Sequence, residues 1–125
     1  MMAARSPEEI HQQFAKIMNA GDVEALVALY ESEAKLVPQP GQVATGKDAI
    51  RAALQSLLGL KPQIHIETRN VIQAGDLASL RSRWRLAGVG PDGRSVETVG
   101  NGTEVIRRQA DGTWLLVIDN PFGAD

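Results

Sequence analysis

The hydrophobic pattern of this chain changes once, near Pro62, and that change constrains the fold more than any other feature. Before Pro62, apolar residues recur roughly every three to four positions, which is the spacing of helices with one buried face. After Pro62, they alternate with polar residues, which is the spacing of strands. Helices followed by strands predict an α+β fold in which the helices pack on one face of an antiparallel sheet.

Three helices are predicted in the first half of the chain, each opened by capping residues. Gly21 and Gly59 suit helix ends, because glycine readily adopts the left-handed backbone that follows a last turn. The strand pattern appears briefly at Ala34–Val37, before a proline- and glycine-rich turn. With their caps, the predicted helices cover Ser6–Gly21, Asp22–Tyr30 and Thr45–Gly59.

Four strands separated by turn sequences are predicted in the second half, as a meander of hairpins. Strands this long should curl, and Gly100 and Gly102 suggest a bulge that bends the sheet. Gly88–Gly93 has the glycine spacing of a dinucleotide-binding loop, but a strand follows it rather than a helix, so it is predicted to be a hairpin loop. The predicted strands are Gln63–Gln73, Leu77–Ala87, Ser95–Gln109 and Trp114–Asp119.

Composition restricts the classes of function. A chain of 125 residues, 43% hydrophobic and 22% charged, predicts one domain over 1–125. There is no cysteine, and the two histidines have no metal-ligand spacing, so neither a metal nor a cofactor is expected. A net charge of −2 disfavours nucleic-acid binding. No apolar run approaches the ~20 residues of a membrane span, and the N-terminus has no signal-peptide pattern, so a cytoplasmic location is expected.

Three stretches of sequence resemble one known family: QQFAKIMNAGDVEALVALY, TGKDAIRAAL and DGTWLLVIDNPFG. Together they are similar to the nuclear-transport-factor-2-like superfamily, in its SnoaL-like and ketosteroid-isomerase-like branch. The resemblance covers about Ser6 to Gly123. It implies a cone-shaped, strongly curved, antiparallel-rich sheet with three N-terminal helices on its concave face, a cystatin-like α+β barrel. Such a fold encloses a pocket for a small apolar molecule.

The catalytic set of the steroid isomerases is incomplete in this sequence. The resemblance implies a tyrosine and an aspartic acid as oxyanion donors and an aspartate as base. The tyrosine position falls on Phe14, which has no hydroxyl group, and the base position falls beside Pro38. The second donor falls near Thr103 or Glu104. Steroid isomerase activity by that mechanism is therefore not expected.

Other polar residues are candidates for chemistry in the pocket. His65 or Asp119 would be the base, although an exposed His65 on the outer sheet face is equally consistent with the pattern. His11 lies off the apolar stripe of the first helix and is expected to be solvated. Strand parity directs Trp84 into the pocket. The expected ligand-binding residues are Phe14, Met18, Tyr30, Trp84, Asn101, Thr103, Ile118 and Asn120.

Two functions stay open at this point. One is a cofactor-free isomerase, cyclase or dehydratase acting on a small apolar molecule, and the other is a binding or dimerisation module without catalysis. Arg81, Arg83 and Arg85 share the opposite face of their strand from Trp84. A homodimer is expected through that outer face.

Overall fold

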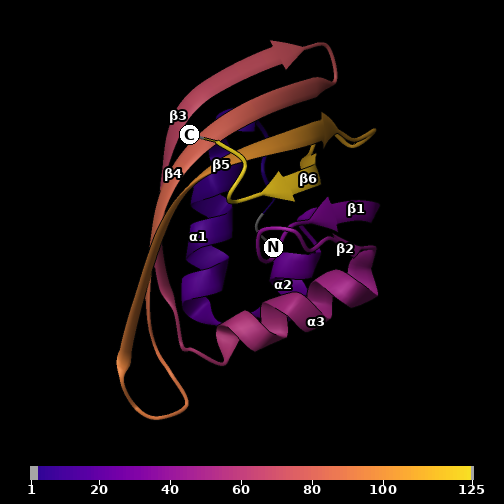
Figure 1. Ribbon diagram of the computed structural model, residues 1–125. Helices are drawn as coiled ribbons and strands as arrows, with labels where there is room; N and C mark the ends of the chain where they lie inside the picture. The colour runs from indigo at the N-terminus through magenta and orange to yellow at the C-terminus, as the bar shows by residue number, and fades with distance from the viewer. Residues whose placement is uncertain (1–2, 125) are drawn as a thin grey trace.

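The computed structural model describes residues 3–124 and has helices in its first half and long strands in its second (Figure 1). A short 3-10 helix at Pro7–Glu9 leads directly into the first α-helix. The elements that follow are α1 (Ile10–Ala20), α2 (Val23–Val27), β1 (Tyr30–Leu36), β2 (Ala44–Thr45), α3 (Lys47–Leu58), β3 (Gln63–Ala74), β4 (Leu77–Val89), β5 (Ser95–Arg108) and β6 (Trp114–Asn120).

The strands form one six-stranded sheet in the order β2-β1-β6-β5-β4-β3. Its pairings are antiparallel except between β1 and β6, which are parallel. In Figure 1 the long strands β3, β4 and β5 curve around α1, and α3 lies across the open end of the curve. The predicted α+β architecture, a curved sheet with three helices on its concave side, is confirmed.

The corner between the first two helices forms as the sequence predicts. Gly21 has φ +76° and ends α1 in the left-handed conformation. The Asp22 side chain accepts a hydrogen bond of 3.1 Å from the Ala25 backbone N–H and so caps α2. The prediction that α2 extends to Tyr30 is wrong. Tyr30 begins β1 because its backbone pairs with β6 at Leu116, and this long-range pairing outweighs local helical spacing.

The predicted bulge at Gly100 and Gly102 is also wrong, because β4 and β5 pair without a register shift from Leu77 to Val89. The two glycines instead make room for side chains of the neighbouring strand. A Cβ on Gly100 would lie 2.5 Å from the indole ring of Trp84. A Cβ on Gly102 would lie 2.7 Å from the Ser82 hydroxyl oxygen. These two positions require glycine for space.

The core lies between the helices and the concave sheet face, where Leu26, Tyr30, Ile50, Leu80 and Ile106 are fully buried. The opposite face of the sheet carries exposed side chains, including Val99 at 58% and Ile118 at 41% of their full exposure. No helix within residues 3–124 is long and apolar enough to cross a membrane.

Candidate functional site

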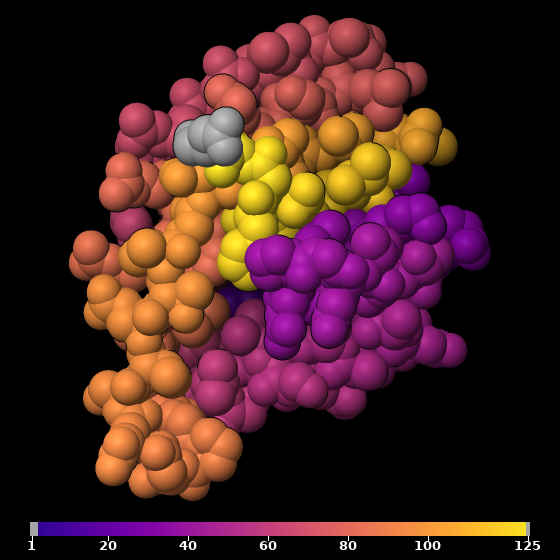
Figure 2. Space-filling model, in the orientation of Figure 1, coloured from indigo at the N-terminus to yellow at the C-terminus, as the bar shows by residue number. Residues whose placement is uncertain are grey.

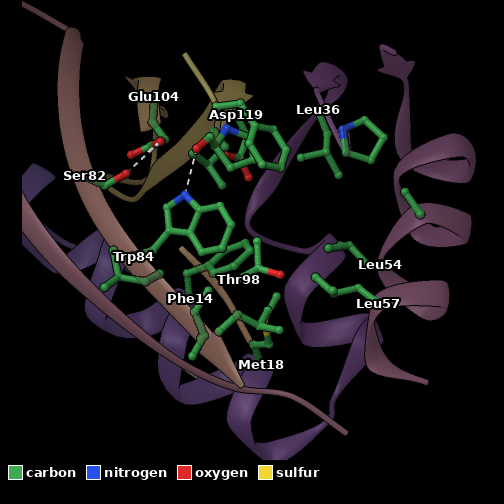
Figure 3. A pocket seen from close by; sticks show the side chains of 18 of the residues that line it. Phe14, Met18, Leu36, Leu54, Leu57, Ser82, Trp84, Thr98, Glu104 and Asp119 are labelled. Atoms are coloured by element: carbon green, nitrogen blue, oxygen red, sulfur yellow. Dashed lines mark hydrogen bonds between the residues drawn. The ribbon is translucent and has the colours of Figure 1, made fainter. Parts of the chain in front are cut away.

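A cavity of about 530 Å³ lies between the concave sheet face, α1 and α3. In Figure 2 the surface is hollowed between the orange strands and the magenta α3, with indigo atoms of α1 at the bottom of the hollow. Most of the wall is apolar, and its carboxyl groups, those of Glu104 and Asp119, lie at one end, which is called the polar end below (Figure 3). Apolar lining residues include Phe14 and Met18 of α1, Leu54 and Leu57 of α3, and Ile64, Ile66, Trp84 and Leu86 of the sheet.

Trp84 forms part of the cavity wall, and its ring is fixed from three sides. Its indole N–H donates a hydrogen bond of 2.7 Å to the Pro121 carbonyl, which holds the C-terminal segment against β4. The Phe122 ring packs edge-on against the indole, with centroids 5.7 Å apart. Gly100 leaves the space in which the indole lies. The inward orientation predicted from strand parity is therefore confirmed.

A buried contact between a histidine and a carboxyl group links α1 to β5 at the polar end of the cavity. His11 Nε2 contacts Glu104 Oε1, and both side chains are only 6% exposed. The second Glu104 oxygen accepts a hydrogen bond of 3.2 Å from the Ser82 hydroxyl (Figure 3). The other ring nitrogen of His11 lies 2.6 Å from the hydroxyl of Thr68 on β3. Both Glu104 oxygens are thus hydrogen-bonded, as a buried carboxylate requires.

A second buried carboxyl group, that of Asp119, lies beside the first. Glu104 and Asp119 are directly opposed across β5 and β6. Directly opposed residues of an antiparallel pair have their Cβ atoms about 4.5–5.5 Å apart. The Tyr30 hydroxyl donates a hydrogen bond of 2.5 Å to Asp119 Oδ2. Two carboxyl groups thus meet at one end of the cavity with different partners.

The surroundings of Asp119 favour its neutral form. Burial and the negative charge of Glu104 together raise the pKa of Asp119 from 3.8 to about 7, although the Tyr30 hydrogen bond and the His11 charge both favour the ionised form. Burial also raises the pKa of Tyr30 well above its usual value, and the Asp119 charge adds to this effect. Tyr30 therefore stays protonated and donates its hydrogen, while Asp119 can exchange a proton near neutral pH.

The expected site residues divide between the cavity and other parts of the fold. Phe14, Met18, Trp84 and Asp119 line the cavity. Tyr30 is fully buried just behind it and reaches it only through Asp119. The remaining five do not line it; they are His65, Asn101, Thr103, Ile118 and Asn120.

The expectation that His65 or Ile118 faces the cavity is corrected by the structure. His65 pairs with Arg85 on the exposed sheet face, while its neighbours Ile64 and Ile66 point inward. Ile118 is exposed because the β5–β6 register shifts between Val105 and Ile106, which leaves an extra residue in β6. This bulge reverses the face of every later β6 residue, and Asp119 rather than Ile118 turns inward.

Asn101, Thr103 and Asn120 also lie away from the cavity wall. Asn101 pairs with Arg83 on the outer face, and its carbonyl accepts a hydrogen bond of 3.1 Å from the Ala124 N–H. The Thr103 hydroxyl donates to the Gly123 carbonyl at 3.2 Å. The sequence places the second oxyanion donor of the steroid isomerases near Thr103 or Glu104. Of these two residues, Glu104 is the one that faces the cavity.

The exposure of His11 is predicted wrongly from the sequence pattern. The pattern predicts a solvated side chain, yet His11 is buried at 5% exposure and lines the cavity. A signal is present, because His11, Phe14 and Met18 follow the i, i+3, i+7 spacing of one helix face. Its partner Glu104 lies 93 residues further along the chain, and no local pattern indicates that contact.

The polar residues of the site do not resemble a metal centre. Within residues 3–124 no group of three or more histidine, cysteine, aspartate or glutamate side chains is arranged to hold a metal ion. What the arrangement offers is a pair of carboxyl groups in unlike surroundings, one paired with histidine and one with tyrosine.

Comparisons with known proteins agree with this fold. The SnoaL-like domain family matches residues 11–117, so the chain belongs to that family. No curated protein sequence matches the chain.

Solved structures with the same fold have low sequence identity to this chain. A ketosteroid isomerase-like protein from Erwinia carotovora atroseptica has a TM-score of 0.78 and 22% identity, over 90% of this chain and 88% of the other. A nuclear transport factor 2-like superfamily protein from Salmonella enterica has a TM-score of 0.79 and 17% identity, over 90% and 84%. A protein with a cystatin-like fold from Novosphingobium aromaticivorans has a TM-score of 0.74 and 22% identity, over 90% and 77%. At these identities the likeness concerns the fold alone.

Proposed function

We propose that this protein is a cofactor-independent acid–base enzyme that isomerises, cyclises or dehydrates a small and largely apolar molecule. One observation carries the proposal: Glu104 and Asp119 are opposed on adjacent strands at the polar end of the cavity and have different hydrogen-bond partners. Two titratable groups held in unlike surroundings can act as acid and base in one reaction. Phe14, Met18 and Trp84 would form the apolar wall against the substrate.

Asp119 is assigned the role of general acid. Its raised pKa leaves a proton on the group near neutral pH, and the Tyr30 hydrogen bond holds one oxygen, so the other is directed to substrate. Glu104 is assigned the role of base, with His11 and Ser82 as positioning residues that fix its two oxygens.

The proposed step balances with these two groups alone. Glu104 removes a proton from a carbon next to a carbonyl group, and the electron pair of the broken C–H bond forms a C=C bond. In an isomerisation, Asp119 donates its proton to the carbonyl oxygen and an enol forms. The enol then takes the proton back from Glu104 at a different carbon and returns its hydroxyl proton to Asp119, which restores both groups. In a dehydration, Asp119 donates its proton to a hydroxyl group on the next carbon, which leaves as water.

Deuterium exchange tests this proposal with simple ketones in place of the natural substrate. Apolar ketones are incubated with the protein in D₂O, and loss of the proton next to the carbonyl is followed by NMR. We expect exchange with the unmodified protein and a decrease of about 100-fold or more in Asp119→Asn and in Glu104→Gln, as is typical for loss of a general acid or base. Asp111→Asn, in an exposed turn, is the matched control. Equal rates in all four proteins would contradict the proposal.

A second candidate function is binding without catalysis. It is favoured by the satisfaction of the polar groups, since both Glu104 oxygens and the Tyr30 hydroxyl already have partners inside the fold. A binding module would be stabilised against heat by an apolar ligand yet would show no deuterium exchange with any ketone.

We also propose that the protein is a homodimer joined through the outer sheet face. Arg81, Arg83 and Arg85 alternate there, and the exposed Val99 and Ile118 lie on the neighbouring strands of that face. Exposed apolar side chains gathered on one sheet face favour a protein partner. Light scattering at micromolar concentration should give twice the chain mass of 13.4 kDa. The mass of a single chain would contradict the dimer. A cytoplasmic location remains a prediction of the sequence.

A further inference from the structure

The cavity wall has an uneven distribution of charge. Its titratable lining residues are His11, Glu104 and Asp119, all at the polar end. No lysine or arginine of the described chain, residues 3–124, lines the cavity. The rest of the wall is apolar or uncharged, and therefore screens charges poorly.

The one basic side chain in the described wall, that of His11, is already paired. His11 contacts Glu104, and that carboxylate is further held by the Ser82 hydroxyl. His11 is therefore not free to pair with an anionic ligand. Asp119 differs, because Tyr30 occupies only its Oδ2 atom, and no hydrogen bond to Oδ1 is formed within the described residues. The Oδ1 atom of Asp119 is therefore open to a hydrogen bond with a ligand.

We infer that the cavity selects its ligand by charge and accepts uncharged molecules while rejecting anions. This inference rests on the proposed use of the cavity as the binding site and specifies the class of molecule that enters it. An anionic group at the polar end would meet two carboxyl groups and find no free cation, so it would be buried without a partner. Elsewhere in the cavity it would meet apolar side chains and the uncharged Gln39, Gln42, Ser56 and Thr98, none of which can balance its charge. An uncharged oxygen, as in a ketone or an alcohol, can instead hydrogen-bond to Asp119 Oδ1.

The rejection of anions should depend on pH, because the charge of Asp119 depends on pH. The groups that face Asp119 are Glu104 from β5, His11 from α1 and Tyr30 from β1. Below the pKa of Asp119, which is about 7, Asp119 is a neutral acid. Above it, ionised Asp119 adds one uncompensated negative charge. Rejection of anions should therefore become stronger as the pH rises through neutrality.

Two fluorescent dyes that differ by one charged group test the inference. N-phenyl-1-naphthylamine is uncharged, and 8-anilino-1-naphthalenesulfonate carries a sulfonate on the same ring system. At about pH 8.5 we expect the uncharged dye to bind the unmodified protein at least tenfold more tightly, the order of effect of one unpaired charge in a poorly solvated site. At about pH 5.5 the difference should shrink, because Asp119 is then protonated. The pH series uses the unmodified protein and so does not depend on a variant folding.

Two variants locate the effect in the cavity. Asp119→Asn removes the titrating charge, so the sulfonate dye should bind about equally at both pH values. Ala53→Phe places a ring at the half-buried Ala53 on the α3 wall and should abolish binding of the uncharged dye.

The remaining outcomes separate failure of this inference from failure of the proposed function. Equal affinity for both dyes at high pH would show that the wall does not discriminate by charge, while leaving the acid–base proposal intact. If neither dye binds, the cavity is not a binding site for apolar molecules, and the inference is wrong. The protein could also discriminate between the dyes by charge while Asp119→Asn exchanges deuterium as fast as the unmodified protein. That result would support the selection by charge and contradict the catalytic role of Asp119.

Discussion

Glu104 and Asp119 lie directly opposite each other on β5 and β6, and both side chains face the same cavity. Two carboxylates at this spacing repel each other, so their partners determine which one keeps a proton. His11 pairs with Glu104, and Tyr30 donates to Asp119. Burial and the Glu104 charge raise the pKa of Asp119 to about 7, so Asp119 keeps its proton to a higher pH than an ordinary carboxyl group. This raised pKa gives the cavity both its proposed chemistry and its proposed selectivity.

The first prediction concerns the influence of Glu104 on its neighbour. The Glu104 charge is the second-largest cause that raises the pKa of Asp119, after burial. Glu104→Gln removes that charge and should lower the pKa of Asp119 from about 7. Carboxyl-carbon NMR titration measures the change. Glu97→Gln, on the exposed face of the same strand, is the matched control and should leave the pKa of Asp119 unchanged. An unaltered Asp119 titration in Glu104→Gln would refute the coupling.

The second prediction concerns stability and its dependence on pH. Because the folded pKa of Asp119 is about 7 and the unfolded value is about 3.9, the folded state retains a proton that the unfolded state loses. This contribution to stability is complete below the unfolded pKa and is lost as the pH rises through the folded one. Asp119→Asn does not titrate. Relative to the unmodified protein, it should therefore gain stability between about pH 4 and pH 8, by on the order of a few kcal/mol.

Urea unfolding across this pH range checks that prediction. Asp111→Asn is a control of opposite sign, since hydrogen bonds from Thr113 lower the pKa of Asp111. Its stabilising contribution is present above the unfolded pKa and is lost only as the pH falls through the lower folded one. The difference between Asp111→Asn and the unmodified protein should thus stay constant from about pH 5 to pH 8. Parallel curves for Asp119→Asn over the same range would rule out a raised pKa.

The third prediction concerns the space that Gly100 leaves for Trp84. A Cβ at this position would lie 2.5 Å from the indole, so Gly100→Ala must displace the ring and strain its hydrogen bond to Pro121. We expect a loss of about 1–3 kcal/mol in the free energy of unfolding, typical of overpacking, with a shifted tryptophan emission. Gly90→Ala is the control, because its Cβ would lie 3.3 Å from the flexible end of the Asp92 side chain and at an ordinary contact distance of 3.6 Å from the Arg94 carbonyl oxygen. Equal stability of the two variants would contradict this account of Gly100.

Periodicity alone predicts much of the fold. The 3.6-residue and two-residue patterns locate the helices and long strands, and parity within β4 places Trp84 inside and Arg83 outside. Parity also indicates the orientation of His65, since Ile64 and Ile66 point inward and the residue between them must point outward. These features depend on neighbours in sequence, so sequence patterns reveal them.

The polar site is less predictable, because it depends on contacts between distant segments. Tyr30 and Asp119 are 89 residues apart, and the parallel β1–β6 pairing brings them together. Simple alternation after the inward-facing Leu116 would turn Ile118 toward the cavity. The bulge in β6 shifts this pattern by one residue, so Asp119 faces the cavity instead. Strand order and register shifts are set by the packed fold as a whole. A local pattern does not encode them.

The protonation of Asp119 tests the central claim most directly. Carboxyl-carbon NMR of the folded protein, labelled at aspartate and titrated from about pH 4 to pH 9, should show one aspartate with a midpoint at about 7, and Asp119→Asn should remove that signal. If every aspartate instead titrates near the ordinary value of 3.8, Asp119 is ionised at neutral pH and cannot be the proposed acid.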